Sequence, residues 1–294
     1  MRLHIAIAIL AGASLAQADY RVSVVKTGLA KPTGLTVQRY FFGNVVFFTQ
    51  VPTPGVPGSQ GGMNSVDLLL PNGQVFNINR GEPEPVNITL ARDGSLYWTC
   101  KSAGVILERS NDGTIAPLLT GLAKPNGITA ARDGDIYFTQ VPTPGVPGSM
   151  GGMNTVNLFD GSSILELTRG EPEPTDIAVD NRTGTAYWTC KSAGVILKRD
   201  SGGNVSLFLR GLNKPTGISI GRRGQLVFSE VPTPGVPGVM GGGNFVWSVD
   251  IDTRAREIVH FGDPEPTDVA ISQDGTIYWT CTSAGVIVKA VPRH

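Results

Sequence analysis

Three oxygen-bearing side chains occupy equivalent positions in a sequence that repeats about every 90 residues. Each follows a Glu-Pro-x motif, and the three residues are Asn87, Asp176 and Asp268. Carboxylate and amide oxygens are the ligands that hard cations such as Ca²⁺ and Mg²⁺ prefer. If the elements that carry these side chains converge, they would form a site for a divalent cation. The alternative is a hydrated polar cluster without a metal.

Six charged residues of alternating sign precede prolines in the same repeat. In chain order they are Lys31, Glu84, Lys124, Glu173, Lys214 and Glu265. In a closed fold they would form a ring with a net charge near zero. We expect this charged ring to be a network of ion pairs between neighbours, each worth little when exposed. The alternative is that the charged ring contacts a ligand directly.

Two further sets of polar residues flank a long Pro/Gly loop that reads VPTPGVPG in each repeat. A glutamine or glutamate precedes the loop and an asparagine follows it. These six residues are Gln50, Gln140, Glu230, Asn64, Asn154 and Asn244. Distinctive loops on one face of a rigid scaffold favour a binding face for a small molecule, a glycan or a protein. The apolar loop tips could instead fold over the centre and cover it.

Nucleophilic chemistry has little support in the sequence. Beyond the N-terminal segment only His260 and His294 remain, and neither recurs in the repeats, so a Ser-His-Asp or histidine-zinc site is not expected. Cys100, Cys190 and Cys281 occupy one position of each repeat, too far apart to pair. We expect buried free thiols, with a reactive or metal-binding thiol as the alternative.

The elements that must position these residues are short strands. Apolar runs bounded by Gly, Pro and Asp predict β-strands, and each repeat divides into two related halves of about 45 residues, the length of one four-stranded propeller blade. Six halves predict an all-β, six-bladed β-propeller made of three tandem two-blade repeats. Their approximate bounds are 28–120, 121–210, and 211–294 together with 19–27. Trp98, Trp188 and Trp279 fall inside predicted strands and should pack between blades.

The chain ends predict closure of the ring. The last half-repeat stops after a third strand at about 285–291, and residues 20–25 supply a strand that has no other partner. The N-terminal strand should therefore complete the last blade and remove the open edges of the sheet.

The Pro-x-Gly-Ile starts, the Asp-Gly turns and strands such as DIYFTQ resemble NHL-type repeats. More broadly, the chain resembles six-bladed propellers of the SMP-30/gluconolactonase and strictosidine synthase-like group. That resemblance implies a central divalent metal held by Glu, Asn and Asp side chains. Only Asn87, Asp176 and Asp268 correspond to such ligands by position, and the N-terminal glutamate motif of that group has no match. Streptogramin-lyase-like propellers have similar strands but rely on a histidine, for which no equivalent motif is present.

The N-terminus is typical of a secretory signal over residues 1–18, with Arg2, an apolar stretch and a small-residue cleavage site. We therefore expect residues 19–294 to form one secreted, extracellular domain, without a membrane span and monomeric. Asn181 and Asn204 lie in predicted turns and are candidate glycosylation sites. The 24 basic side chains less Arg2 leave 23, against 24 acidic ones, which argues against a nucleic-acid partner.

Two classes of function follow. The first is a secreted propeller that binds a ligand through its threefold loop face, with Ca²⁺ or Mg²⁺ at the centre as a further expectation. The alternative is a metal-dependent hydrolase of the SMP-30/lactonase type, with a carboxylate as the base. The scarcity of histidine, the paired charges of the ring and the nearly perfect threefold repeat favour binding.

Overall fold

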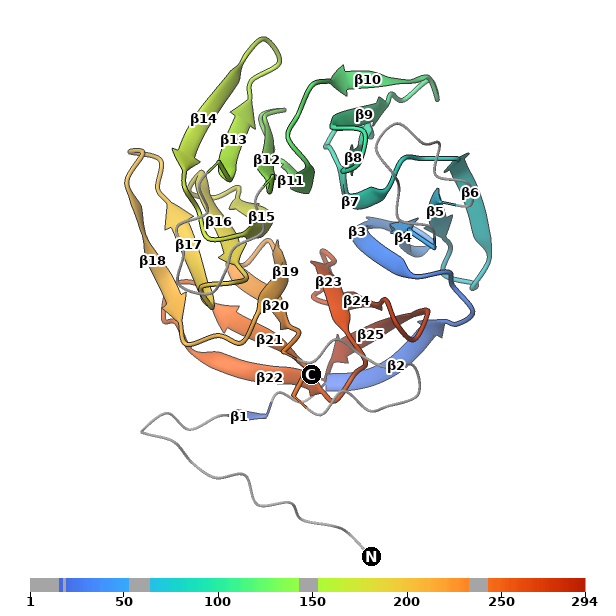
Figure 1. Cartoon of the computed structure of the whole chain (residues 1–294). Helices are drawn as coiled ribbons and strands as arrows, with labels where there is room; N and C mark the ends of the chain where they lie inside the picture. Colours follow the sequence, from blue (N-terminus) through green and yellow to red (C-terminus); the bar gives the residue numbers. More distant parts are fainter. Residues whose placement is uncertain (1–15, 18–19, 53–63, 143–152, 233–242, 294) are drawn as a thin grey trace, which may run out of the picture.

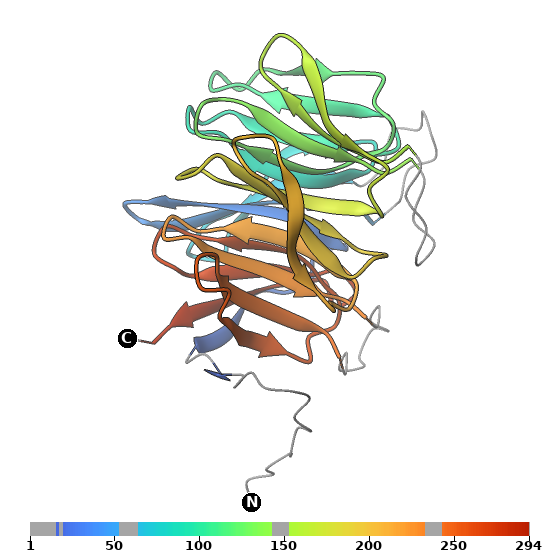
Figure 2. The same ribbon diagram turned by 90° about the vertical axis from the view of Figure 1, so that its left-hand side faces the viewer.

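The protein is an all-β, six-bladed β-propeller, as the sequence predicts. The computed structural model describes residues 16–17, 20–52, 64–142, 153–232 and 243–293. These residues form six antiparallel sheets that surround a common axis (Figure 1). In side view the six sheets make a single ring with no second layer (Figure 2). No helix that could cross a membrane occurs in the described part of the chain.

Each blade has four strands, and the first strand is the innermost. Blade 1 contains β3 (Pro32–Tyr40), β4 (Gly43–Gln50), β5 (Ser65–Leu69) and β6 (Val75–Arg80). Blade 2 contains β7 (Pro85–Leu90), β8 (Leu96–Cys100), β9 (Val105–Arg109) and β10 (Ile115–Leu119). Blade 3 contains β11 (Pro125–Ala130), β12 (Ile136–Gln140), β13 (Thr155–Phe159) and β14 (Ile164–Arg169).

The second half of the ring follows the same order. Blade 4 contains β15 (Pro174–Asp180), β16 (Thr185–Cys190), β17 (Val195–Arg199) and β18 (Val205–Arg210). Blade 5 contains β19 (Pro215–Ile220), β20 (Gln225–Glu230), β21 (Phe245–Asp250) and β22 (Arg256–Phe261), beside which the two-residue β1 (Ala16–Gln17) lies in parallel. Blade 6 contains β23 (Pro266–Ile271), β24 (Ile277–Cys281), β25 (Val286–Pro292) and, as its outer strand, β2 (Tyr20–Lys26).

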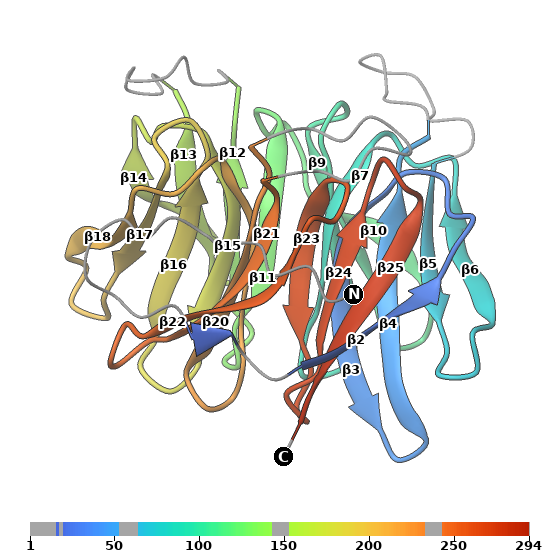
Figure 3. The ribbon, with the colours of Figure 1, turned by 90° about the horizontal axis from the view of Figure 1, so that it is seen from below.

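The predicted closure of the ring is confirmed. β2 pairs antiparallel with β25, with Val22 opposite Ala290, so a strand near the N-terminus and the last strand share one blade (Figures 1 and 3). This pairing gives the outer edge of β25 a hydrogen-bonded neighbour and leaves no gap between the last blade and the first.

The hydrophobic core lies between the blades. Each of its six clusters joins two neighbouring blades, as where Leu35 and Phe48 of blade 1 pack with Tyr278 of blade 6. Trp98 and its two counterparts in even blades are fully buried in these clusters. The prediction that the tryptophans pack between blades is therefore confirmed.

Blade 1 departs from the threefold repeat at the end of the propeller that carries the short turns. Its first two strands have 9 and 8 residues, against 6 and 5 in blade 3, and their hairpin projects beyond the neighbouring turns (Figure 3). Phe41 at its tip is fully exposed, and its ring packs edge-on against Phe42. The strands that carry the site residues nevertheless start at equivalent prolines in all six blades.

The three cysteines are free and buried, as expected. The Cys100 thiol donates to Glu82, with 3.4 Å between Sγ and Oε2, and burial together with that carboxylate raises the pKa of the thiol. We therefore predict that the folded protein does not react with an aromatic disulfide reagent at about pH 8, whereas the unfolded chain releases the colour of three thiols. A fast-reacting thiol in the folded state would support the reactive alternative.

Candidate binding cavity

The six residues of the charged ring all have left-handed backbone conformations, with φ between 51° and 58°. The carbonyl group of each accepts a hydrogen bond from the residue that follows the second strand of its own blade. For Lys124 and Val141 the O···N distance is 3.1 Å, and for Glu173 and Lys191 it is 3.0 Å. A left-handed conformation costs an L-residue other than glycine about 1 kcal/mol. Six such positions around one mouth mark this end of the propeller as a candidate functional site.

The expected network of ion pairs within the charged ring is not formed. Among the described residues, none of the Lys–Glu neighbours of the ring lies within 4.0 Å, whereas pairs elsewhere do, such as Arg182 with Asp180 at 3.0 Å. Two of the three lysines bond to the backbone of their own blades instead. Lys214 Nζ donates to the carbonyl oxygen of Pro232 at 3.2 Å, and Lys124 does the same at Pro142. The ring charges are thus left available to a ligand.

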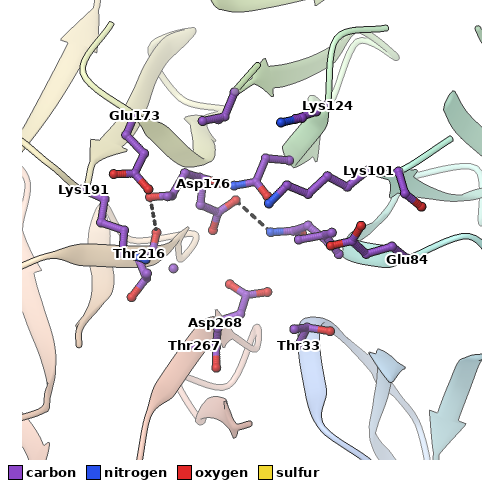
Figure 4. Close-up of a pocket in the computed structure, with 17 residues that line it drawn as sticks. Thr33, Glu84, Lys101, Lys124, Glu173, Asp176, Lys191, Thr216, Thr267 and Asp268 are labelled. Atoms are coloured by element: carbon purple, nitrogen blue, oxygen red, sulfur yellow. Dashed lines mark hydrogen bonds between the residues drawn. The ribbon is translucent and has the colours of Figure 1, made fainter. Parts of the chain in front are cut away.

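Below the charged ring a cavity of about 540 Å³ opens, and all six blades contribute to it (Figure 4). Its walls are the residues that follow the inner prolines. These are Thr33, Val86, Asn126, Thr175, Thr216 and Thr267. Hydroxyl groups from the preceding blades hold this wall in place, since Thr189 Oγ1 donates to the carbonyl oxygen of Thr216 at 2.6 Å and Thr280 Oγ1 to that of Thr33 at 2.6 Å.

These wall residues were not predicted from the sequence, and a local irregularity of the strands explains why. In a regular strand, neighbouring side chains point to opposite faces, so only one of two adjacent positions should face the centre. Here the register shifts between Pro174 and Asp176, and an equivalent shift follows the inner proline of each of the other five blades. Such a bulge lets Thr175 and Asp176 both border the cavity. The recurrence of threonine after these prolines was the available signal.

Two lysines that were not predicted as site residues also line the cavity. Lys101 and Lys191 follow the second strands of blades 2 and 4, and Lys101 extends toward Asp176 in the middle of the cavity (Figure 4). In blade 6 the equivalent residue is Thr282, whose Oγ1 donates to the carbonyl oxygen of Pro32 at 2.6 Å. The cavity is therefore not threefold symmetric, although the sequence nearly is.

The three central side chains do converge, and they form the floor of the cavity. Asn87 Nδ2 donates to Asp176 Oδ1 at 3.0 Å, and Asp268 lies beside Asp176. Both carboxylates also accept backbone N–H groups of the next blade, from Ile218 to Asp176 Oδ2 at 2.8 Å and from Leu35 to Asp268 Oδ2 at 2.7 Å. The same three side chains border a second cavity of about 260 Å³ on the other side, so the floor separates two spaces along the axis.

The floor fits a divalent cation only in part. Burial raises the pKa of Asp176, and the charge of Asp268 raises it further; burial likewise raises the pKa of Asp268. Two carboxylates are suitable ligands for a hard cation, but Asn87 turns its amide nitrogen toward them while its Oδ1 accepts the N–H of Ile88 at 2.7 Å. The described part of the chain contains no cluster of three or more His, Cys, Asp or Glu side chains that could hold a metal ion. A proton shared by the two carboxylates matches this donor set better.

The two sets of polar residues beside the Pro/Gly loops hold turns. Gln140 Oε1 accepts the N–H of Ala123 at 2.6 Å, and Glu230 Oε1 accepts that of Asn213 at 2.6 Å, as Gln50 does with Ala30. Asn64, Asn154 and Asn244 are fully buried, and each donates to a backbone carbonyl group two residues before the next charged-ring glutamate. These side chains shape the mouth without lining the cavity.

The remaining predicted positions lie away from the cavity. Asn181 and Asn204 are exposed in the short turns, where they accept a backbone N–H from Arg132 and pair with Asp200 respectively. Asn87, which also stands in a glycosylation motif, is buried. The apolar tips of the VPTPGVPG loops fall within 53–63, 143–152 and 233–242, outside the described residues.

No protein-family model and no curated protein sequence matches this chain. Several solved structures, in contrast, are similar to this chain. A gluconolactonase from Xanthomonas campestris is similar with a TM-score of 0.72 and 17% identity, over 94% of this chain and 90% of that one. A virginiamycin B lyase from Staphylococcus aureus is similar with a TM-score of 0.60 and 16% identity, over 94% and 100%. The likeness is one of fold.

A third neighbour shows how varied the uses of this fold are. The nidogen/laminin complex contains a chain that is similar with a TM-score of 0.60 and 18% identity, over 77% of this chain and 79% of that one. The expected resemblance to gluconolactonase-type and NHL-type propellers is thereby confirmed for the fold. Function must be argued from the cavity itself.

Proposed function

We propose that this protein binds a small polar molecule in the cavity at the charged mouth of the propeller. The observation that carries the proposal is the cavity of about 540 Å³, because residues of all six blades line it and most of them are charged or hydrogen-bonding. Its volume is that of a typical small-molecule site. The left-handed backbone of the charged ring adds support, because strained backbone conformations cluster at functional sites, where the surrounding structure maintains them.

The residues of the cavity support a catalytic function less well than a binding function. The virginiamycin B lyase is catalytically inactive when one histidine is replaced by alanine, whereas none of the described residues that line this cavity is a histidine. A lactonase-type hydrolase is the alternative function. Ca²⁺ or Mg²⁺ at Asn87, Asp176 and Asp268 is a separate proposal, which rests on the two carboxylates. A cation there would supply Lewis-acid activation of a bound carbonyl group.

Export is a further proposal, and it rests on the signal-like segment at residues 1–18. Glycosylation at Asn181 and Asn204 accompanies it, supported by the exposure of both side chains. Mass spectrometry of protein recovered from the medium of a secreting host would show whether residues 1–18 are removed and whether either asparagine carries a glycan.

Filling the cavity tests the binding proposal. Val86 lines the cavity without a side-chain hydrogen bond, so Val86→Trp should occupy much of it and leave the network intact. Val205→Trp places the same indole on the exposed outer strand β18 and serves as the control. In an NMR screen of sugars, sugar acids, sugar lactones and amino acids, we expect ligands of the unchanged protein to be lost only in Val86→Trp. Equal binding by both variants would contradict the proposal, and hydrolysis of lactones in the screen would replace it with the hydrolase alternative.

A further inference from the structure

Above the floor formed by Asp176 and Asp268, the charged residues that line the cavity all come from one side of the ring. Blade 2 provides Glu84 and Lys101, blade 3 provides Lys124, and blade 4 provides Glu173 and Lys191. Blades 5, 6 and 1 contribute hydroxyl groups to the opposite wall, where Thr267 and Thr33 lie across the cavity from Lys124 (Figure 4). These three threonines of blades 5, 6 and 1 are called the hydroxyl wall and comprise Thr33, Thr216 and Thr267. The cavity thus has a charged side and an uncharged hydrogen-bonding side.

The charged side has an excess of positive charge. Lys101, Lys124 and Lys191 face Glu84 and Glu173 there, so this side carries a net charge of +1 above the floor carboxylates. Lys101 and Lys191 are the two of these lysines that lie outside the charged ring. Neither of these two ammonium groups has a hydrogen-bond or ion-pair partner among the residues that the structure describes. Among the described residues, neither lysine forms an ion pair with the floor carboxylates Asp176 and Asp268, which accept backbone N–H groups instead.

Among the described residues, the nearby glutamates form no direct ion pair with Lys101 or Lys191. Burial raises the pKa of Glu84 and that of Glu173. The charge of Lys101 lowers the pKa of Glu84, and the charges of Lys191 and then Lys101 lower that of Glu173, so both lysines act on the glutamates without a direct ion pair. Unpaired lysine side chains beside a cavity are suited to a carboxylate, since a charge-assisted hydrogen bond is about twice as strong as a neutral one.

We infer that the ligand of this cavity is a small hydroxylated carboxylic acid, bound with its carboxylate between Lys101 and Lys191 and its hydroxyl groups against the hydroxyl wall. The inference rests on the proposed function and specifies its ligand class. The third repeat shows that the lysines are not needed for folding, because Thr282 occupies the same position and is accommodated by hydrogen bonds to Pro32 and Thr267.

Two isosteric probes separate charge from shape. Glucuronate and glucuronamide differ only in the charge of one group, and glucosamine carries the opposite charge on a similar ring. Calorimetry should show glucuronate bound about tenfold more tightly than glucuronamide, the effect expected of one charge-assisted hydrogen bond. In the double variant Lys101→Thr/Lys191→Thr, which copies the third repeat, that preference should fall below about twofold.

Lys198→Thr is the matched control, since Lys198 lies on β17 of blade 4 outside the cavity and should keep the preference. Thermal unfolding of each variant confirms that it is folded. Equal binding of glucuronate and glucuronamide, a preference that survives the double variant, or tighter binding of glucosamine would each overturn the inference. The first two results leave the proposed function standing. If none of the three compounds binds, the inference is also overturned, and the Val86→Trp experiment decides the proposed function independently.

Discussion

Replacing Gly127 with alanine is expected to destabilise the propeller by about 3 kcal/mol or more, the upper end of the cost of overpacking. A Cβ atom at Gly127 would lie 2.5 Å from the Cα atom of Asp176 and 2.8 Å from its Oδ1. Because the nearest atom belongs to the backbone, it cannot move aside by a change of rotamer. The innermost strands of blades 3 and 4 would have to separate, and with them the floor of the cavity. Urea unfolding measures the loss.

Gly243→Ala is the control for this substitution. Gly243 also lacks a positive φ, and its added Cβ would lie 3.4 Å from Pro232 Cγ, which is an ordinary contact. The equivalent residue of the second repeat is Met153, so a side chain is tolerated there. We expect Gly243→Ala to change the free energy of unfolding by less than about 0.5 kcal/mol. Similar losses in both variants would refute the steric explanation for the glycines of odd blades.

The free energy of unfolding is expected to fall by about 2 kcal/mol as the pH rises from about 5 to about 8, at up to about 1.4 kcal/mol per unit. The pKa of Asp176 and that of Asp268 are raised in the folded state, chiefly by burial. A raised pKa means that the folded chain holds a proton that the unfolded chain releases. The resulting stability is complete below the unfolded pKa near 3.8 and is lost as the pH rises through the folded pKa. Chemical denaturation at a series of pH values measures the slope.

Asp268→Asn should flatten this slope, and blade 2 shows that an asparagine is accommodated there, since Asn87 is its equivalent. Asp160→Asn changes an exposed turn in which hydrogen bonds to Ser162 and Ser163 lower the pKa, so it should leave the slope above pH 5 unchanged. The slope is read rather than the absolute stability, because Asp268→Asn also weakens the bond to the N–H of Leu35. A decline that disappears on adding Ca²⁺ to the unchanged protein would refute the shared proton and support the cation proposal.

Much of the architecture was predictable because it depends on local patterns that repeat. The period of the motifs predicts six blades, and the unpaired strand at residues 20–25 predicts the closure that β2 and β25 make. Trp188 and Cys190 were correctly expected to be buried, since each falls on an apolar strand at the same place in every repeat. The convergence of Asn87 with the two aspartates was also correct, because innermost strands of a propeller face one axis.

The cavity was only partly predictable, because its properties depend on backbone torsion and on contacts between blades. Alternating charges suggest ion pairs, but residues such as Lys124 and Glu173 take left-handed backbone conformations, and among the described residues no neighbours of the ring form an ion pair. A bulge after each inner proline brings Thr175 to the wall beside Asp176, against the alternation that a regular strand would impose. Strand content, blade number and closure were thus determined by the sequence alone. The tertiary structure decided which side chains line the cavity, since a side chain's direction is set by torsions and neighbours that no local pattern records.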